Sequence, residues 1–401
     1  MSEIKIANQE KTFPSNFPQW PYYSQDEINA VVKVLESGQV NQWTGRLVKN
    51  FEQAFAKTFQ QPYAVAVANG SLALDLALKV ADISSGDEVI VTPRSFIASA
   101  SCVVLRGATP VFADVDAITQ NITPETIEPL ITDKTKAIIP VHLNGYPCDM
   151  PAIMDLANEH NLFVIEDCAQ AHGAQIKEKP IGSFGHAAAF SFCQDKIMST
   201  GGEGGMLLLN SEKDWQKAWS FKDHGKDYDT VFKDHPPGFR WVHQSIGTNW
   251  RMTEVQAVIG IKQLEKLPHW LARRTTIAQK LHDCLSPYQA IESFLPPPGI
   301  KPAWYRFSFH VNENRLNAYW DRKKVMAAIQ AEGIPCLEIC PEIYKEKAFE
   351  TIDCPTPNCP TAQTLSNKVC VLLTHPTIND QDLELILNGL KKVINQASRC
   401  D

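Results

Sequence analysis

Three groups of residues in this 401-residue chain could take part in chemistry, and each follows a short apolar run. In the first group, Asn69, Gly70 and Ser71 stand between the run AVAVA and the helical pattern LALDLAL. Backbone N–H groups at such a helix start can hold a phosphate, because the helix dipole favours negative charge there. The Ser71 hydroxyl would add a donor. For this segment alone, a plain turn with a helix cap is the favoured interpretation.

The second group ends the run LFVIED, where Asp167 is followed three residues later by Gln170. An acid at the end of an apolar strand can face a ligand from the floor of a site. An aspartate in that place can keep a pyridinium nitrogen protonated, so that the ring acts as an electron sink. The alternative is a carboxylate that caps the next helix.

The third group is the segment SFCQDKIMSTGGEGG, in which Lys196 follows a buried strand and Ser191 precedes it by five residues. A lysine near a low-dielectric interior is expected to have a lowered pKa, which makes its amine a nucleophile toward a carbonyl. Ser191 could donate to a phosphate. Most lysines are solvated surface residues, so the setting of Lys196 carries this hypothesis.

Composition and missing motifs exclude several classes of protein. The net charge is −7, which gives no general attraction for nucleic acid or an anionic membrane. No apolar run reaches 18 residues and the N-terminus does not resemble a signal peptide, so a cytoplasmic protein is expected. The absence of a Walker A loop and of GxGxxG disfavours a kinase or a nicotinamide dehydrogenase.

The elements that must position these residues alternate between helix and strand. A first helix is expected after Ser24, with Glu27 completing a capping box, an apolar stripe at Ile28, Val31, Val32 and Leu35, and an end at Gly38. Compact apolar runs then alternate with helices of crossover length, which predicts a doubly wound α/β domain. Those runs are residues 88–92, 109–115, 136–142, 162–167, 187–192 and 205–210. Ligands of such domains bind beyond the carboxyl ends of the strands.

The chain is expected to divide into an N-terminal segment with a large domain, residues 1–260, and a small C-terminal α/β domain, residues 261–401. Helices are predicted from about Arg322 to Gly333 and over DQDLELILNGLKKVINQ. Eleven scattered cysteines argue against a disulfide framework. Cys336, Cys340, Cys354 and Cys359 could form a zinc site, but their loose spacing favours ordinary thiols, and no metal is expected.

Taken together, these motifs resemble the DegT/DnrJ/EryC1/StrS family of sugar aminotransferases. The likeness runs from NQWTGRLVKNFEQAF through NGSLALDLAL, VIEDCAQAHGA and FSFCQDKIMSTGGEGG to GTNWRMTEVQAVIGIKQL. It implies the aspartate-aminotransferase-like fold type I of pyridoxal-phosphate (PLP) enzymes. That fold has a large, mostly parallel sheet sandwiched by helices and a smaller C-terminal α/β domain.

The resemblance also implies roles for single residues. Lys196 matches the lysine that forms the Schiff base, and Asp167 matches the partner of the pyridine nitrogen. Gln170 would lie near the phenolic oxygen and Phe96 would stack on the ring. Gly70, Ser71 and Ser191 match phosphate-binding positions, and Asn249 matches an asparagine that reaches the cofactor of a neighbouring subunit, so the active sites of a homodimer would be shared. Trp43, Thr44, His142 and Tyr344 are candidate substrate contacts.

The function implied is amination of a nucleotide-linked keto sugar, a 4-keto-6-deoxy hexose, with L-glutamate as donor, for surface polysaccharide or lipopolysaccharide synthesis. A dehydratase of the same fold is the nearest alternative, but those relatives carry histidine in place of the lysine. A non-catalytic regulatory protein of this fold is another. The sequence departs from the family pattern at Asp195, beside Lys196, and in the segment GIPCLEICPEIYKEKAF, which makes the substrate the least certain part of the assignment.

Overall fold

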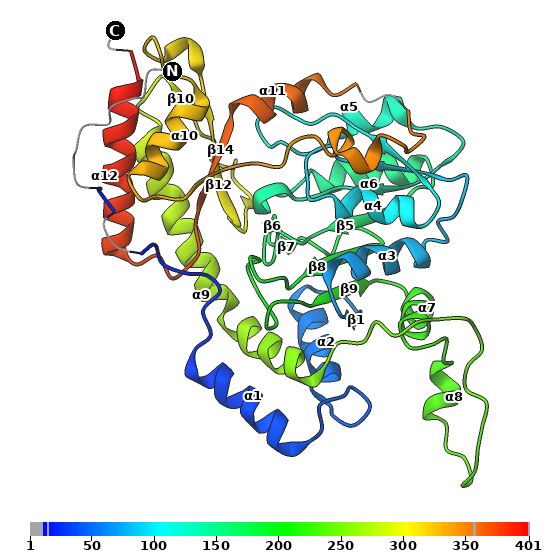
Figure 1. Ribbon diagram of the computed structural model, residues 1–401. Coiled ribbons are helices and arrows are strands. Elements are labelled where there is room, and N and C mark those ends of the chain that lie inside the picture. Colours follow the sequence, from blue (N-terminus) through cyan, green and yellow to red (C-terminus); the bar gives the residue numbers. More distant parts are fainter. Residues whose placement is uncertain (1–10, 14–15, 356–357, 400–401) are drawn as a thin grey trace.

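The large domain is built on one twisted sheet with helices on both faces (Figure 1). A computed structural model describes residues 11–13, 16–355 and 358–399. Within these residues the large sheet has seven strands in the order β1-β9-β8-β5-β4-β2-β3. Their bounds are β1 (Tyr63–Val67), β2 (Glu88–Val91), β3 (Thr109–Phe112), β4 (Thr135–Ile139), β5 (Phe163–Asp167), β8 (Ala187–Ser191) and β9 (Gly205–Leu209).

The sheet is mostly parallel, as the sequence predicts. Strands β3, β2, β4, β5 and β8 pair in parallel, whereas β9 is antiparallel to both β8 and β1. The glycine-rich segment after Lys196 turns the chain back, so β9 runs against its neighbours. Every residue of β8 and β9 is buried, which explains why these strands are apolar on both faces.

Helices lie on both faces of this sheet. They are α2 (Leu47–Thr58), α3 (Gly70–Val80), α4 (Ala98–Leu105), α5 (Pro124–Ile127), α6 (Met150–Glu159) and α7 (Glu212–Lys222). The short helix α8 (Tyr228–Phe232) lies in an excursion away from the sheet (Figure 1). Short elements complete this part: η1 (Glu128–Leu130), η2 (Leu143–Gly145), and the small sheet of β6 (Gln175–Ile176), β7 (Lys179–Pro180) and β11 (Ile300–Lys301).

Helix α1 (Gln25–Ser37) begins at the predicted capping box of Ser24 and Glu27 and ends at Gly38, which has a left-handed φ of 66°. It packs on the long helix α9 (Glu254–Leu285) (Figure 1). The predicted stripe faces this contact only in part. Val31 packs, beside the buried Val34, against Val258 and Ile259 of α9. Ile28, Val32 and Leu35 are 46%, 44% and 58% exposed and do not join this cluster.

The small domain is an antiparallel sheet covered by helices, with strand order β10-β12-β14-β13. Its strands are β10 (Ile291–Glu292), β12 (Arg306–Val311), β13 (Cys336–Glu338) and β14 (Val369–Leu373), and its helices are α10 (Arg322–Ala331) and α12 (Asp380–Ala397). The remaining elements are η3 (Glu313–Arg315), η4 (Ile343–Lys345), η5 (Lys347–Phe349) and α11 (Pro360–Lys368). Helix α9 passes through the predicted boundary at residue 260 and contributes to the cores of both domains.

The four cysteines considered for zinc do not converge. Cys336 lies in the core of the small domain, and Cys359 lies in that of the large domain, where its thiol donates to the carbonyl of Phe112. Among the residues that the structure describes, these cysteines form no cluster of potential metal ligands. No helix within the described ranges is both long and apolar enough to cross a lipid bilayer.

Candidate active site

A pocket of about 550 Å³ lies at the carboxyl ends of β1, β5 and β8. Because parallel strands end at the same edge of the sheet, residues far apart in sequence meet there. Its lining includes seven of the residues predicted from the sequence: Gly70, Ser71, Phe96, Asp167, Gln170, Ser191 and Lys196.

Asp167 forms the floor of the pocket at the end of β5. Its carboxylate is 3% exposed and accepts hydrogen bonds from Ser99 Oγ at 2.8 Å and from the Ala169 N–H at 3.1 Å. Burial raises the pKa of this carboxyl group, and the two donors only partly oppose that effect. A cationic group in the pocket would restore the balance and keep the carboxylate ionised.

The start of α3 and the end of β8 approach each other closely. Asn69 caps α3 by accepting the Leu72 N–H at 3.0 Å, so the first turn of the helix opens into the pocket. A Cβ on Gly70 would lie 2.5 Å from the Cβ of Ser191, and a Cβ on Gly205 would lie 2.3 Å from the carbonyl oxygen of Asn69. Glycine at both positions therefore lets α3 pack directly on β8 and β9. This packing brings the N–H groups of the first turn of α3 and the Ser191 hydroxyl to the same pocket, an arrangement of donors that suits a phosphate.

Lys196 lies in the loop after β8 with its side chain 14% exposed. Its Nζ lies 3.6 Å from Asp195 Oδ1 and 5.0 Å from the centre of the Tyr305 ring. Burial opposes charging of this amine, but the electrostatic interactions with Tyr305 and Asp195 outweigh it, so the pKa of Lys196 lies above its usual value. The expectation that the pKa of Lys196 is lowered was therefore wrong, because Asp195 supplies a counter-charge.

Asp195 is held by two residues from the small domain. The hydroxyl of Tyr305 donates to Asp195 Oδ2, and Arg306 Nη2 lies 3.5 Å from the same oxygen and 3.2 Å from the Tyr305 hydroxyl. The Trp20 indole N–H donates to the backbone carbonyl of Lys196 at 2.7 Å. Sequence reasoning missed Trp20, Tyr305 and Arg306, although the aromatic–basic run WYR before a strand was a possible signal.

Gln170 and Phe96 complete the walls. The Gln170 side-chain oxygen accepts the Asn144 N–H at 2.7 Å, and the amide NH₂ has no hydrogen-bond partner among the described residues, so it can donate to a ligand. Phe96 is 63% exposed although it lines the pocket. An exposed aromatic ring at the mouth of a pocket is suited to stacking on a flat ligand.

The other predicted residues do not line this pocket. His142 is fully buried behind it, where its Nδ1 accepts the Cys148 N–H and its Nε2 lies 3.3 Å from Glu166 Oε2. Tyr344, in η4, packs edge-on against Phe112 at the end of β3.

Trp43, Thr44 and Asn249 lie on the outer side of the large domain. The Trp43 indole donates to Asp223 at 3.1 Å, and Thr44 donates to the carbonyl of Asn41. Asn249 is exposed, and its backbone forms a β-bridge with Asp223. None of these three residues lines the pocket of its own chain.

Comparison with known proteins gives consistent matches. The sequence profile of the DegT/DnrJ/EryC1/StrS aminotransferase family matches residues 21–391. An aminotransferase structure from Psychrobacter cryohalolentis is 48% identical, with a TM-score of 0.92 over 94% of this chain and 99% of that one. The spore coat polysaccharide biosynthesis protein SpsC of Bacillus subtilis is 33% identical over 94% of this chain and 96% of its own length. GDP-perosamine synthase of Escherichia coli O157:H7 is 44% identical over 64% of this chain and 68% of its own length.

The contact between Asp195 and Lys196 leads to a pH prediction. In the cofactor-free protein, Asp195→Asn should lower the pKa of Lys196, because it removes a negative charge 3.6 Å from Nζ. The measurement is the pH at which acetylation of Lys196 reaches half its maximal rate, followed by peptide mass spectrometry.

Glu203→Gln is the matched control, since Glu203 lines the same pocket without a contact to Lys196 and should leave this pH unchanged. An unchanged or higher midpoint in Asp195→Asn would contradict the assigned electrostatics.

Proposed function

Because the chain belongs to the DegT/DnrJ/EryC1/StrS aminotransferase family, we propose that it is a PLP-dependent aminotransferase acting on a nucleotide-linked keto sugar. L-glutamate would be the amino donor, and the amino sugar would enter surface polysaccharide or lipopolysaccharide synthesis. The observation that carries this proposal is the convergence of the Lys196 amine and the buried Asp167 carboxylate on one pocket.

The residues of the pocket fit PLP. The N–H groups of the first turn of α3 and the Ser191 hydroxyl would hold the phosphate, with the Ser71 hydroxyl as a further donor. The phosphate is anionic, and the pocket offers it N–H and hydroxyl donors at a helix start. Asp167 would pair with the pyridine nitrogen, Gln170 would donate to the phenolic oxygen and Phe96 would cover a face of the ring. When bound, PLP would supply the electron sink that makes a proton on the substrate's carbon acidic.

Lys196 would carry the protons. As a neutral amine it can take a proton from the substrate carbon, and as an ammonium group it can return that proton. Asp195, at 3.6 Å, would stabilise the ammonium form between these two events. The lysine is present where dehydratases of this fold carry histidine, and this favours transamination over the dehydratase alternative. A non-catalytic regulator would have no need of the Lys196–Asp195 pair.

A homodimer with shared sites is part of the proposal. Large apolar side chains are exposed on α1 and around the excursion after α8, where Phe239, Trp241 and Ile246 are 81%, 85% and 91% exposed. Such exposed apolar groups are typical of protein–protein interfaces. Asn249 follows this excursion, and a second copy of the chain would bring it toward a neighbouring pocket.

Purified protein should be yellow, and borohydride should bleach the colour and fix the cofactor to Lys196. Lys196→Ala should still bind PLP, since the phosphate and ring contacts remain, but transamination should fall by at least about a thousandfold. The measurements are absorbance, peptide mass spectrometry and release of 2-oxoglutarate. Lys213→Ala, at an exposed lysine, is the control and should behave as wild type. Turnover near the wild-type rate in Lys196→Ala would contradict the role proposed for Lys196.

Asn249→Asp should weaken PLP binding across the interface, because it places a carboxylate near a phosphate. If subunits exchange, mixing inactive Lys196→Ala chains with inactive Asn249→Asp chains should restore one competent site in each mixed dimer. Activity of the mixture, measured against each variant alone, tests this. A protein that is monomeric at micromolar concentration with full PLP occupancy would rule out shared sites.

The substrate is proposed to be a nucleotide-linked 4-keto-6-deoxy hexose. One relative is named GDP-perosamine synthase, which supports a sugar carried on a nucleoside diphosphate. The test follows 2-oxoglutarate release with 4-keto and 3-keto nucleotide sugars. Turnover with the 4-keto sugar is expected; turnover with the 3-keto sugar alone would overturn the regiochemistry, and turnover with free keto acids alone would overturn the sugar assignment.

A further inference from the structure

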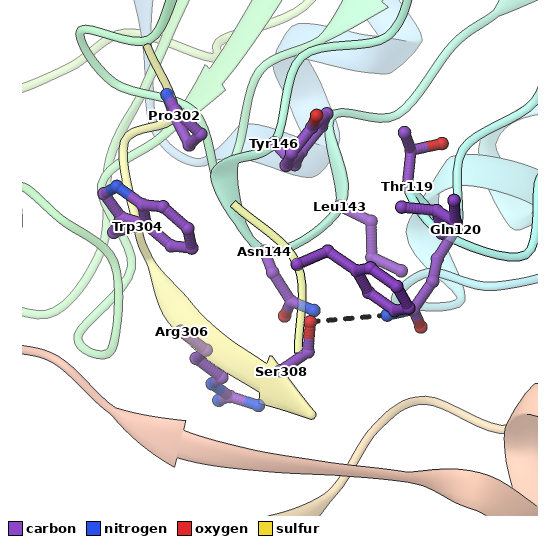
Figure 2. A pocket seen from close by; sticks show the side chains of 11 residues that line it. Thr119, Gln120, Leu143, Asn144, Tyr146, Pro302, Trp304, Arg306 and Ser308 are labelled. Carbon is purple, nitrogen blue, oxygen red and sulfur yellow. Dashed lines mark hydrogen bonds between the residues drawn. The ribbon is translucent and has the colours of Figure 1, made fainter. Parts of the chain in front are cut away.

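A second pocket, of about 480 Å³, lies beside the candidate active site. Asp195 lines both pockets, so they share a wall. The second pocket is closed by three parts of the chain: the N-terminal segment around Trp20, the middle of α9 at Arg274, and the small domain at Arg306. Figure 2 shows a neighbouring pocket that shares Arg306 with this one, with Trp304 on the lead into β12 and Arg306 at the start of the strand. The backbone of this lead is bound to the large domain by the Tyr305 N–H, which donates to the carbonyl of Asn144.

Arg274 is a buried cation without an anionic partner in the described part of the chain. Its side chain is 1% exposed, and Nη1 donates only to neutral acceptors: the carbonyls of Trp304 and Tyr305, and the hydroxyl of Thr374. Within the same residues Nε has no hydrogen-bond partner. Burial lowers the pKa of Arg274 to about 9. An unpaired buried charge is costly, so an anion bound here would be strongly favoured.

The charges around this pocket are unbalanced. Arg274, Arg306 and the nearby Lys196 face one carboxylate, that of Asp195, which Lys196 and Arg306 already share. His375 also lines the pocket, but burial, with help from Arg274, lowers its pKa to about 3, so it is neutral. The pocket therefore has an excess of positive charge that a small anion could match.

We propose that this second pocket binds a carboxylate of the amino-acid donor, with Arg274 as the principal anchor and Arg306 as the second. The inference rests on the proposed function. A donor carboxylate lies within a few bonds of the reacting amino group, so its binding site must adjoin Lys196. Asp195 and Tyr305 satisfy this requirement, since both contact Lys196 and both line the second pocket. Phe17, Trp20 and Leu373 give the pocket an apolar side suited to the methylene groups of glutamate.

The experiment measures binding of glutarate to the PLP-loaded protein by calorimetry. Glutarate carries the two carboxylates of the donor and no amino group, so it binds without reacting. Arg274→Met should weaken glutarate binding by at least about tenfold.

Because Arg274 also holds backbone carbonyls, Gln19→Glu provides a second test. Gln19 is exposed at the rim of the pocket, and a negative charge there should weaken glutarate binding severalfold, whereas the neutral variant Gln19→Met should bind as wild type.

Three results would overturn the inference: no glutarate binding to the wild type, equal affinity in wild type and Gln19→Glu, or displacement of glutarate by GDP, which would assign the pocket to a nucleotide phosphate. The turnover assay decides the proposed function separately. Under the inference, the KM for L-glutamate should rise in Gln19→Glu while the KM for the keto sugar stays unchanged. Loss of the glutarate response with normal turnover would reject the pocket and leave the proposed function standing.

Discussion

The buried carboxylate of Glu166 holds the segment before β8 against the end of β5, and the candidate active site depends on this contact. It is fully buried at the end of β5 and accepts the N–H groups of Gly182, Phe184 and Gly185 at 2.9, 2.8 and 2.7 Å. Each of these donors would be left unsatisfied without it, at a cost of about 1–3 kcal/mol apiece. The segment they belong to leads directly into β8, so one buried side chain holds β8 in register beside β5.

That register determines which groups meet in the pocket. Asp167 stands opposite Ala189, and two residues further on Ser191 pairs with Gly205 of β9. A Cβ at Gly70 would clash with Ser191, and one at Gly205 would clash with the backbone of Asn69, so glycine at both positions lets α3 come close enough to β8 for its first turn to face Ser191. The N–H and hydroxyl donors at this edge of the pocket are thus brought together by backbone packing rather than by any cationic side chain.

Much of this arrangement was predictable from sequence because it depends on strand ends. Lys196, Asp167, Gly70 and Ser191 each follow or end a buried run, and the rule that carboxyl ends of parallel strands meet is sufficient to bring them together. Trp20 and Tyr305 were not predictable in this way. They reach Lys196 and Asp195 from 176 and 110 residues away, and no local pattern encodes such a contact.

Sequence patterns also failed to predict which way some side chains point. The apolar stripe of α1 correctly predicted a helix, but periodicity does not tell which part of the structure the stripe faces. Val31 packs toward α9, whereas the other three predicted residues are exposed. His142 follows β4 at the correct edge of the sheet, but its ring turns inward toward Glu166 instead of into the pocket. An arginine within a helix such as Arg274 is usually assigned to the surface, and only the packing of α9 against Trp304 and Thr374 places its charge inside.

The environment of Lys196 links the two domains. The large domain supplies the lysine and Asp195, the small domain supplies Tyr305 and Arg306, and the N-terminal segment holds the Lys196 carbonyl through Trp20. The charge on the lysine is therefore set by groups whose positions depend on how the small domain sits on the large one. Because Tyr305 and Arg306 also border the second pocket, an anion bound there would act on the same groups that set the charge of the lysine. Occupancy by the donor and the proton affinity of the base would then be coupled through Asp195, without any direct contact between donor carboxylate and lysine.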